Sequence, residues 1–297
     1  SITRMPVSSA ELSTSCVSGQ ILYVEAPYGN VWTNIITEDI AAAGLIRGTT
    51  LTLELNGKAL TVPFVSFFSQ APKGSPLAYI NSRGLFSLAL NMDDFSKRHN
   101  LDGGEPLKIR ISDLDLVDVM AMSGDLIGFD IKYATADNFT GKKVYPLPRC
   151  YLRRDAALAL LKAAASARAI SSKQFGICAH DCYRPLSVQK IFWAIMPDER
   201  YVADPAKGSR HNRAMAVDVY PCDYSGKPLP APTAYDDFTE KAHRNYSGAG
   251  KEATENSRLL EALMNEAGFQ GLATEWWHYD YNGWDKAPVM DIAFSAE

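Results

Sequence analysis

Short apolar runs separated by turn-forming residues dominate the first hundred or so positions. Each run is bounded by Gly, Asn or Pro, and the runs cover residues 20–25, 51–55, 60–68 and 86–90. Runs of this length between turn residues are typical of β-strands. The N-terminal part therefore predicts a small β-barrel or sandwich.

The pattern changes after one more strand-like run at 107–111 and an acidic stretch at 113–118. Residues 154–168 are rich in Ala and Leu, and residues 255–267 repeat apolar side chains at helical spacing until a glycine ends the run. Both of these later segments predict helices. We therefore expect a domain boundary near residues 112–122.

The second half mixes these helices with further elements. Residues 175–179 and 216–220 predict strands, whereas the polar and broken segment 228–247 predicts a long surface loop. Helices mixed with strands in this way indicate the α+β class. The sequence thus predicts a β-barrel domain at 1–115 and an α+β domain at 120–297.

Composition and charge narrow the choice of partners. The 297 residues are 46% hydrophobic and carry a formal net charge of -4 from interspersed signs, which argues against nucleic-acid binding and against a polybasic membrane surface. The best apolar run, at 156–165, is shorter than the ~20 residues of a membrane span, so we expect a soluble protein with a small partner. The oligomeric state is left open.

The first residue, Ser1, bears on localisation. A removed export signal and a trimmed sequence would both explain a start at Ser in place of Met. We favour an exported or periplasmic protein over a cytoplasmic one.

Five cysteines are too few for a disulfide scaffold and form no paired CxxC zinc site: Cys16, Cys150, Cys178, Cys182 and Cys222. In an extended strand Cys178 and Cys182 would lie about 13 Å apart, too far for a shared ion or a mutual bond. We interpret these two as ordinary thiols and leave open one or two disulfides in the chain.

The densest group of potential metal ligands lies in the segment 209–218 and, much later, in Glu275-Trp276-Trp277-His278. A catalytic zinc needs about three nitrogen or oxygen ligands and one open position for water. His211, Asp218 and His278 supply that set, so the sequence predicts a zinc site on these residues.

The spacing requires a turn within each half of this set. His211 and Asp218 would point to opposite faces of one regular strand, as would Glu275 and His278. We expect a turn at 212–214 to correct the first pair and a bulge or bend to correct the second.

Glu275 is the natural general base, because it can take a proton from the attacking water and deliver it to the leaving amine. Arg184, at a turn marked by Pro185, is our candidate for stabilising the developing oxyanion. Taken alone, a structural salt bridge would explain Arg184 equally well. We interpret the remaining histidines, His99, His180 and His243, as ordinary polar residues.

Several motifs in the same order resemble the zinc D-Ala-D-Ala dipeptidases of the vancomycin-resistance type. They are Tyr183-Arg184-Pro185, Ser209-x-His211 to Asp218, Glu275-Trp276-Trp277-His278 and the segments 132–141 and 235–238. The resemblance covers residues 122–295. It implies zinc on the predicted ligands, Glu275 as base, Arg184 as transition-state stabiliser, and a substrate pocket lined by Tyr133, Ser209 and Asp236.

The resemblance further implies that Asp236 and Tyr133 lie near the free ammonium of the dipeptide, which favours a free dipeptide over a long peptide. Two positions depart from the family pattern. Ala214 stands where Gly is usual, and Cys182 stands where Ala is common. A positive φ at Ala214 would cost about 1 kcal/mol or more.

The N-terminal part is similar to the C-terminal β-barrel of S-adenosylmethionine hydrolases and fluorinases. The similarity lies in the segments 24–35 and 76–84 and includes Asn30, Ser82 and Arg83. It does not extend to the α/β domain that carries the catalytic Asp of that family. We therefore expect no adenosyl chemistry and a structural or docking role for the barrel, with small-molecule binding as the alternative.

Two other functions compete with the dipeptidase prediction. A carboxypeptidase or endopeptidase that trims peptidoglycan stems could use the same zinc chemistry in a more open cleft. A zinc-containing binding protein without turnover is the alternative from another class. Glu275 beside His278 argues against the latter, because a structural zinc site needs no base.

Overall fold

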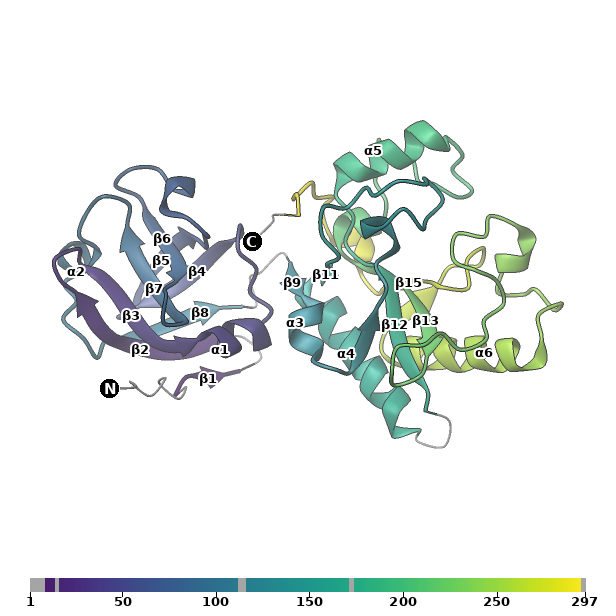
Figure 1. The fold of residues 1–297 in the computed structure, drawn as a ribbon, viewed down its shortest axis with the longest axis horizontal. Coiled ribbons are helices and arrows are strands. Elements are labelled where there is room, and N and C mark those ends of the chain that lie inside the picture. Colours follow the sequence, from purple (N-terminus) through teal and green to yellow (C-terminus); the bar gives the residue numbers. More distant parts are fainter. Residues whose placement is uncertain (1–8, 14–15, 112–115, 171–173, 295–297) are drawn as a thin grey trace. The chain divides into compact units, whose positions relative to one another are not determined.

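The computed structural model describes residues 9–13, 16–111, 116–170 and 174–294 (Figure 1). The chain divides into two compact units, Ser1–Val117 and Asp118–Ala296. Part of the acidic stretch expected at 113–118 lies outside the described residues. Each unit is considered by itself below.

The first unit is an antiparallel β-barrel with sheet order β5-β4-β8-β2-β3-β7-β6, in which β1 pairs with β2. Its strands are β1 (Glu11–Leu12), β2 (Cys16–Glu25), β3 (Asn30–Ile36), β4 (Thr50–Leu55), β5 (Lys58–Pro63), β6 (Pro76–Ile80), β7 (Leu85–Leu90) and β8 (Pro106–Arg110). An isolated bridge between Phe64 and Ala78 and a 2.9 Å hydrogen bond from Val65 N–H to the Ala78 carbonyl nearly close the barrel. The predicted barrel is confirmed.

The barrel differs from the sequence prediction in several strands. β1, β3 and β6 were not predicted as separate strands, β2 begins earlier than the run expected at 20–25, and the run expected at 60–68 ends at Pro63. The chain turns there because the side-chain oxygen of Gln70 accepts hydrogen bonds from the backbone N–H groups of Ser66 and Phe67. A short 3-10 helix, Phe68–Gln70, follows. Two α-helices complete the unit, α1 (Thr37–Ala42) and α2 (Phe95–His99).

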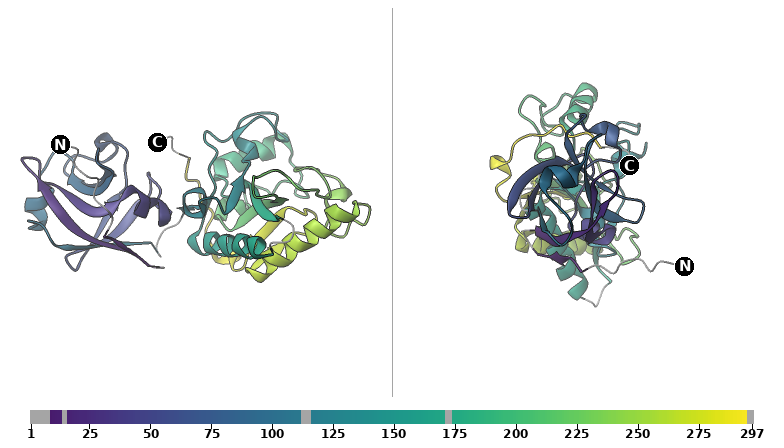
Figure 2. Two further views of the ribbon diagram at one scale, coloured as in Figure 1. Left: turned by 60° about the horizontal axis from the view of Figure 1, so that its bottom comes forward. Right: turned by 90° about the vertical axis from the view of Figure 1, so that its left-hand side faces the viewer.

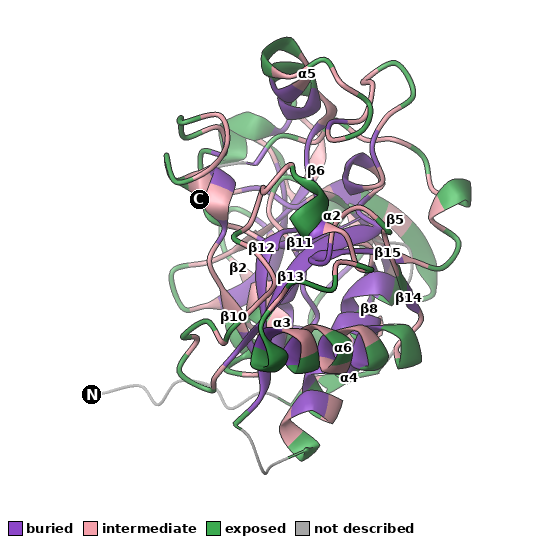
Figure 3. Cartoon of the chain, turned by 90° about the vertical axis from the view of Figure 1, so that its right-hand side faces the viewer, coloured by how far each residue is buried: buried purple, intermediate pink, exposed green. Residues whose placement is uncertain are grey.

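The second unit is built on a five-stranded sheet with the order β10-β12-β13-β15-β14. The strands are β10 (Ile127–Phe129), β12 (Gly176–Asp181), β13 (Ala216–Cys222), β14 (Phe269–Gly271) and β15 (His278–Tyr281). β10 runs parallel to β12, and the other pairs are antiparallel. Every residue of β12 and β13 is buried (Figure 3), which explains why these strands read as continuous runs rather than alternating ones.

Helices α4 (Arg154–Ala169) and α6 (Lys251–Glu266) lie side by side against one face of this sheet (Figure 2). Helix α5 (Leu186–Ile195) lies beyond the end of β12, away from these two helices (Figure 1). The helix expected at 154–168 is confirmed, and the one expected at 255–267 starts earlier, at Lys251. The unit therefore has the predicted α+β character.

Short elements complete the second unit. They are β9 (Val117–Asp118), at the boundary, α3 (Val119–Ser123), β11 (Tyr151–Leu152) and the 3-10 helices η2 (Lys132–Ala134), η3 (His211–Arg213), η4 (Glu240–Ala242) and η5 (Trp284–Lys286). The segment expected to be a surface loop at 228–247 contains only η4 as a helix. In the described parts of the chain, none of the helices has the length and apolarity needed to cross a lipid bilayer.

Two disulfides correct the interpretation of Cys178 and Cys182 as ordinary thiols. Cys178 bonds Cys222, because the antiparallel pairing of β12 with β13 brings their Cα atoms to 5.9 Å. Cys182, just past the end of β12, bonds Cys150. The partners come from distant parts of the sequence, so spacing within 178–182 could not identify them.

Candidate active site

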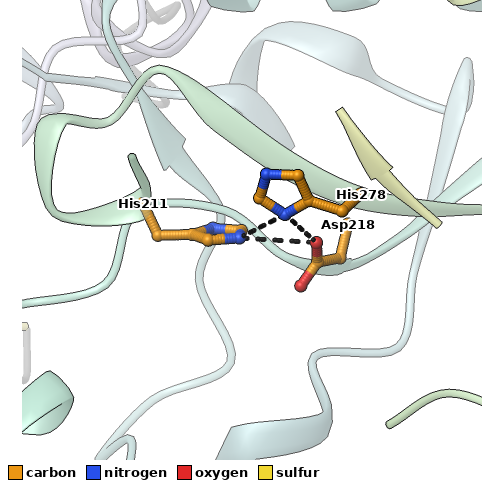
Figure 4. A group of neighbouring side chains, drawn as sticks. All are labelled: His211, Asp218 and His278. Carbon is orange, nitrogen blue, oxygen red and sulfur yellow. Dashed lines mark hydrogen bonds and ion pairs between the residues drawn. The ribbon is translucent and has the colours of Figure 1, made fainter. Parts of the chain in front are cut away.

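Three buried side chains converge at one end of the sheet (Figure 4). His211 Nε2 lies 3.2 Å from His278 Nδ1 and 3.4 Å from Asp218 Oδ1, and His278 Nδ1 lies 3.0 Å from Asp218 Oδ1. These are the residues predicted to hold zinc, and the structure brings all of them together.

Strand register and a turn of the chain bring these side chains together. Asp218 on β13 is the direct antiparallel neighbour of His278 on β15, so strand register alone brings them together. His211 opens η3, and the chain then turns through Ala214, which has φ 55° and ψ 34°. The turn expected at 212–214 is present. An Ala in this left-handed conformation costs about 1 kcal/mol, which explains why Gly is suited to the position.

Hydrogen bonds on the outer sides of the rings define which nitrogen faces the centre. His211 Nδ1 lies 2.7 Å from the Cys182 carbonyl oxygen, and His278 Nε2 lies 2.9 Å from Asp280 Oδ1. Both oxygens can only accept, so these outer nitrogens carry the protons. When the rings are neutral, the lone pairs of His211 Nε2 and His278 Nδ1 therefore face Asp218 Oδ1.

Three acceptor atoms at this distance repel one another unless a proton or a metal cation lies between them. Zinc–ligand bonds of about 2.0–2.1 Å in tetrahedral geometry would place the ligand atoms about 3.3 Å apart. The observed separations of 3.0, 3.2 and 3.4 Å match that arrangement. The donor set fits a zinc ion in both chemistry and spacing.

The electrostatics of the pocket also favour a cation. Burial lowers the pKa of His278, but hydrogen bonds to Asp218 and Asp280 raise it to about 10. Burial likewise raises the pKa of Asp218, yet His211 and His278 hold it well below its usual range. The site thus attracts positive charge, which an ion supplies in competition with protons.

Glu275 lies in the turn between β14 and β15, with Oε2 3.9 Å from His278 Nδ1. Its backbone N–H donates to the Leu272 carbonyl at 3.4 Å. A bend of the chain, one of the two expected devices, therefore places the carboxylate beside the metal ligands. Burial raises the pKa of Glu275, with His278 opposing part of the rise, and a raised pKa suits a carboxylate that accepts protons.

Arg184 is buried at the pocket wall and is held from behind. Its Nη2 and Nε donate to Asp181 Oδ2 at 2.7 and 3.1 Å, and its Nη1 donates to Gln189 Oε1 at 2.9 Å. Burial lowers the pKa of Arg184, but Asp181 raises it well above the usual value, so the guanidinium stays charged. Arg184 therefore forms a salt bridge with Asp181 and also lines the pocket.

The residues predicted to bind substrate lie in the same pocket. Tyr133 OH donates to Asp236 at 3.2 Å from either carboxylate oxygen, and Ser209 Oγ accepts from the His211 N–H at 3.2 Å. Burial, followed by the charge of Asp218, raises the pKa of Asp236 to about 7. Every predicted site residue lines one cavity of about 270 Å³, just below the ~300–1,000 Å³ usual for drug-sized ligands.

The second unit is similar in sequence to known proteins. Residues 112–293 match the family described as Peptidase M15, D-Ala-D-Ala dipeptidase. The chain belongs to this family. The D-alanyl-D-alanine dipeptidase of Escherichia coli (strain K12) is 36% identical over 181 residues, which cover 61% of this chain and 92% of that protein. The dipeptidase of Enterococcus faecalis (strain ATCC 700802 / V583) is 32% identical over 52% of this chain and 85% of that protein.

The barrel matches a different family. Residues 19–108 match the C-terminal domain of SAM hydroxide adenosyltransferases. A fluorinase of Actinoplanes sp. (strain N902-109) is 39% identical over 95 residues, which make up 31% of this chain and 32% of the fluorinase. The chain thus spans about a third of the fluorinase. Both resemblances predicted from the sequence are confirmed.

The structure adds residues to the peptidase site that sequence reasoning missed. Tyr235 OH donates to Asp218 Oδ2 at 2.7 Å and so occupies the second oxygen of that carboxylate. Asp181 anchors Arg184, and Asp280 orients His278. For Asp280 the sequence did hold a signal, since it follows His278 by two positions on one strand and so shares its face.

Proposed function

We propose that this chain hydrolyses D-Ala-D-Ala or a closely similar dipeptide, with zinc bound by His211, Asp218 and His278 and Glu275 as general base. The observation that carries the proposal is the convergence of three potential ligand atoms 3.0–3.4 Å apart beside the Glu275 carboxylate. The names of the matched relatives support the substrate. The family as a whole supports dependence on a metal.

The residues of the chain divide the chemistry among them. A zinc ion, when bound, supplies Lewis acidity toward the attacking water and the scissile carbonyl. Glu275 takes a proton from the water and returns it to the leaving amine. Arg184 faces the pocket with a fixed positive charge, suited to the oxygen that becomes negative in the transition state. The Asp236 carboxylate and the Tyr133 hydroxyl suit the ammonium of a free dipeptide.

Metal analysis paired with an assay of D-Ala release tests the proposal. We expect about one zinc per chain and turnover of D-Ala-D-Ala. Glu275→Ala should keep the zinc and lose at least ~10²-fold in kcat. The matched control is Glu266→Ala, an exposed glutamate on α6, which should leave both unchanged. Turnover retained in Glu275→Ala would remove Glu275 as base.

The breadth of the substrate range is tested separately. If the pocket recognises a free ammonium, the enzyme should cleave the dipeptide in preference to a peptidoglycan stem pentapeptide. Preference for the pentapeptide would instead support a carboxypeptidase. Calorimetric binding of the dipeptide without turnover would support a binding protein.

We also propose that the protein works in an oxidising compartment outside the cytoplasm. The two disulfides support this proposal, because structural disulfides persist in such compartments and are rare in the cytosol. Cell fractionation followed by thiol labelling under denaturing conditions tests it. Fully reduced protein recovered from the cytoplasm would contradict it.

A further inference from the structure

Arg244 is bonded to both ends of the turn that carries Glu275. Its Nε donates to the Leu272 carbonyl at 2.8 Å, where the turn begins, and its Nη2 donates to the His278 carbonyl at 2.7 Å, where β15 begins. Its backbone N–H also donates to the Ala273 carbonyl at 3.0 Å. One side chain thus ties the two ends of the turn to each other.

Further contacts fix the guanidinium itself. Nη1 donates to Tyr279 OH at 3.1 Å, and the guanidinium carbon lies 4.3 Å from the centre of the Tyr279 ring. Glu261, on α6, supplies a carboxylate oxygen 3.5 Å from Nη1. Arg244 is therefore held by a charge, an aromatic face and several acceptors, and it has one orientation.

Gly271 provides the space that this orientation requires. A Cβ atom at position 271 would lie 2.2 Å from the guanidinium carbon of Arg244 and 2.3 Å from Nε. Atoms cannot approach so closely, and Arg244 could move away only by giving up its bonds to the turn. The last residue of β14 is thus matched to Arg244.

Two backbone hydrogen bonds also support the turn. Trp276 N–H donates to the carbonyl of Ala242, in the segment before Arg244, at 3.0 Å. Leu272 N–H donates to the His278 carbonyl at 3.1 Å and so joins the two ends of the turn directly. Glu275 lies between these hydrogen bonds along the chain, so the position of its carboxylate depends on them. The carbonyl of His278 accepts two of them, from Arg244 and from Leu272.

We propose that Arg244 is a positioning residue that holds Glu275 and His278 in one geometry, and that Gly271 keeps its place open. The inference rests on the proposed function, since it assigns Arg244 a role through the base and a metal ligand. Arg244 lies behind the turn and acts on the reaction only through these two residues. Outer partners of metal ligands have effects of about 10–100-fold on metal affinity or activity.

The first test is Arg244→Met, which keeps an unbranched stem and removes the guanidinium. We expect kcat and the zinc affinity, measured by competition with a chelator, each to fall about 10–100-fold. KM should change less than about threefold, because the predicted substrate contacts come from other segments. Arg244→Lys keeps the charge and can reach fewer acceptors, so its losses should be intermediate.

A double-mutant cycle with Gly271→Ala tests the matched pair. The single Gly271→Ala variant should reproduce the losses of Arg244→Met, because the new methyl group displaces the guanidinium. In Gly271→Ala/Arg244→Met the clash is gone, so the double variant should be no worse than Arg244→Met. Additive losses in the double variant would contradict the pairing of the two positions.

Backbone hydrogen exchange gives a readout that needs neither zinc nor substrate. The amides of Leu272 and Trp276 should lose protection in Arg244→Met. They should keep it in the control Arg258→Met, which alters an arginine of α6 that lines the same surface cavity as Arg244. A folded Arg244→Met variant with wild-type kcat, zinc affinity and exchange would overturn the inference. Wild-type protein without turnover would instead refute the proposed function, and the exchange data would still decide whether Arg244 holds the turn.

Discussion

Asp181 receives two hydrogen bonds from Arg184, at 2.7 Å from Nη2 and 3.1 Å from Nε, and both side chains are buried. The same carboxylate accepts from Tyr145 OH at 2.7 Å through its other oxygen. Asp181 therefore fixes the direction of the charged group at the pocket wall. The sequence did not reveal this role of Asp181, because a separation of three positions from Arg184 does not by itself predict a salt bridge.

Replacing Asp181 by Asn should weaken both the fold and the reaction. The Arg184 charge would remain buried without its counter-charge, which typically costs about 3–5 kcal/mol of unfolding free energy. We expect a lower urea midpoint and a kcat/KM reduced more than tenfold. The matched control is Asp125→Asn, which alters an exposed pair with Arg168 and should leave kcat/KM unchanged.

A second prediction concerns the outer partner of His278. Asp280→Asn removes the carboxylate that orients the imidazole through Nε2, while Asn keeps the size of the side chain. Zinc affinity should fall about 10–100-fold with little change in the fold. Chelator competition and circular dichroism measure the two quantities. Unchanged zinc affinity would show that Asp280 does not support the ligand.

The sequence predicted the ligand set because residue type and spacing carry that information. His211, Asp218, Glu275 and His278 combine rare chemistry with motifs of fixed order. The supporting partners are harder to predict, because several are backbone carbonyls, such as that of Cys182 beside His211 Nδ1. A carbonyl is present at every position, so only the tertiary fold identifies the one that is used.

The same limit applies to the elements of the fold. The helix at 154–169 has a long apolar pattern and was predicted, whereas α5 is ten residues long, directly follows Pro185 and was missed. The disulfide between Cys178 and Cys222 depends on the register of β12 against β13. Such long-range pairing leaves no local pattern, and the sequence could only leave disulfides open.

Asp236 should give the zinc-free protein a distinctive dependence on pH. Burial and the charge of Asp218 raise its pKa from 3.8 to about 7, so the folded state holds a proton that the unfolded state releases. The stabilisation that this bound proton provides is therefore lost as the pH rises from about 4 to about 7. Over this range the free energy of unfolding falls by about 1.4 kcal/mol per pH unit.

Asp236→Asn removes this dependence, so the stability of the variant relative to the parent should increase as pH rises from about 4 to 7. Urea unfolding of both zinc-free proteins, followed by tryptophan fluorescence at several pH values, measures the difference. A difference that stays constant across this range would contradict the raised pKa. Added zinc should reduce the effect, because a cation at Asp218 offsets the charge that raises the pKa of Asp236.

The two disulfides should differ in their effect on the site. Replacing both Cys150 and Cys182 by Ser should cost about 2–4 kcal/mol of unfolding free energy by the loop-closure argument. It should also weaken zinc binding, because the Cys182 carbonyl accepts from His211 Nδ1 and Cys182 would lose its covalent anchor to Cys150, the residue before β11. Replacing Cys178 and Cys222 should cost comparable stability and leave zinc affinity unchanged, since that bond ties two strands that already pair.

Chelator competition at a temperature where both variants are folded separates the effect on zinc affinity from the effect on stability. An equal loss of zinc affinity in both variants would show that the disulfides act on the site only through overall stability.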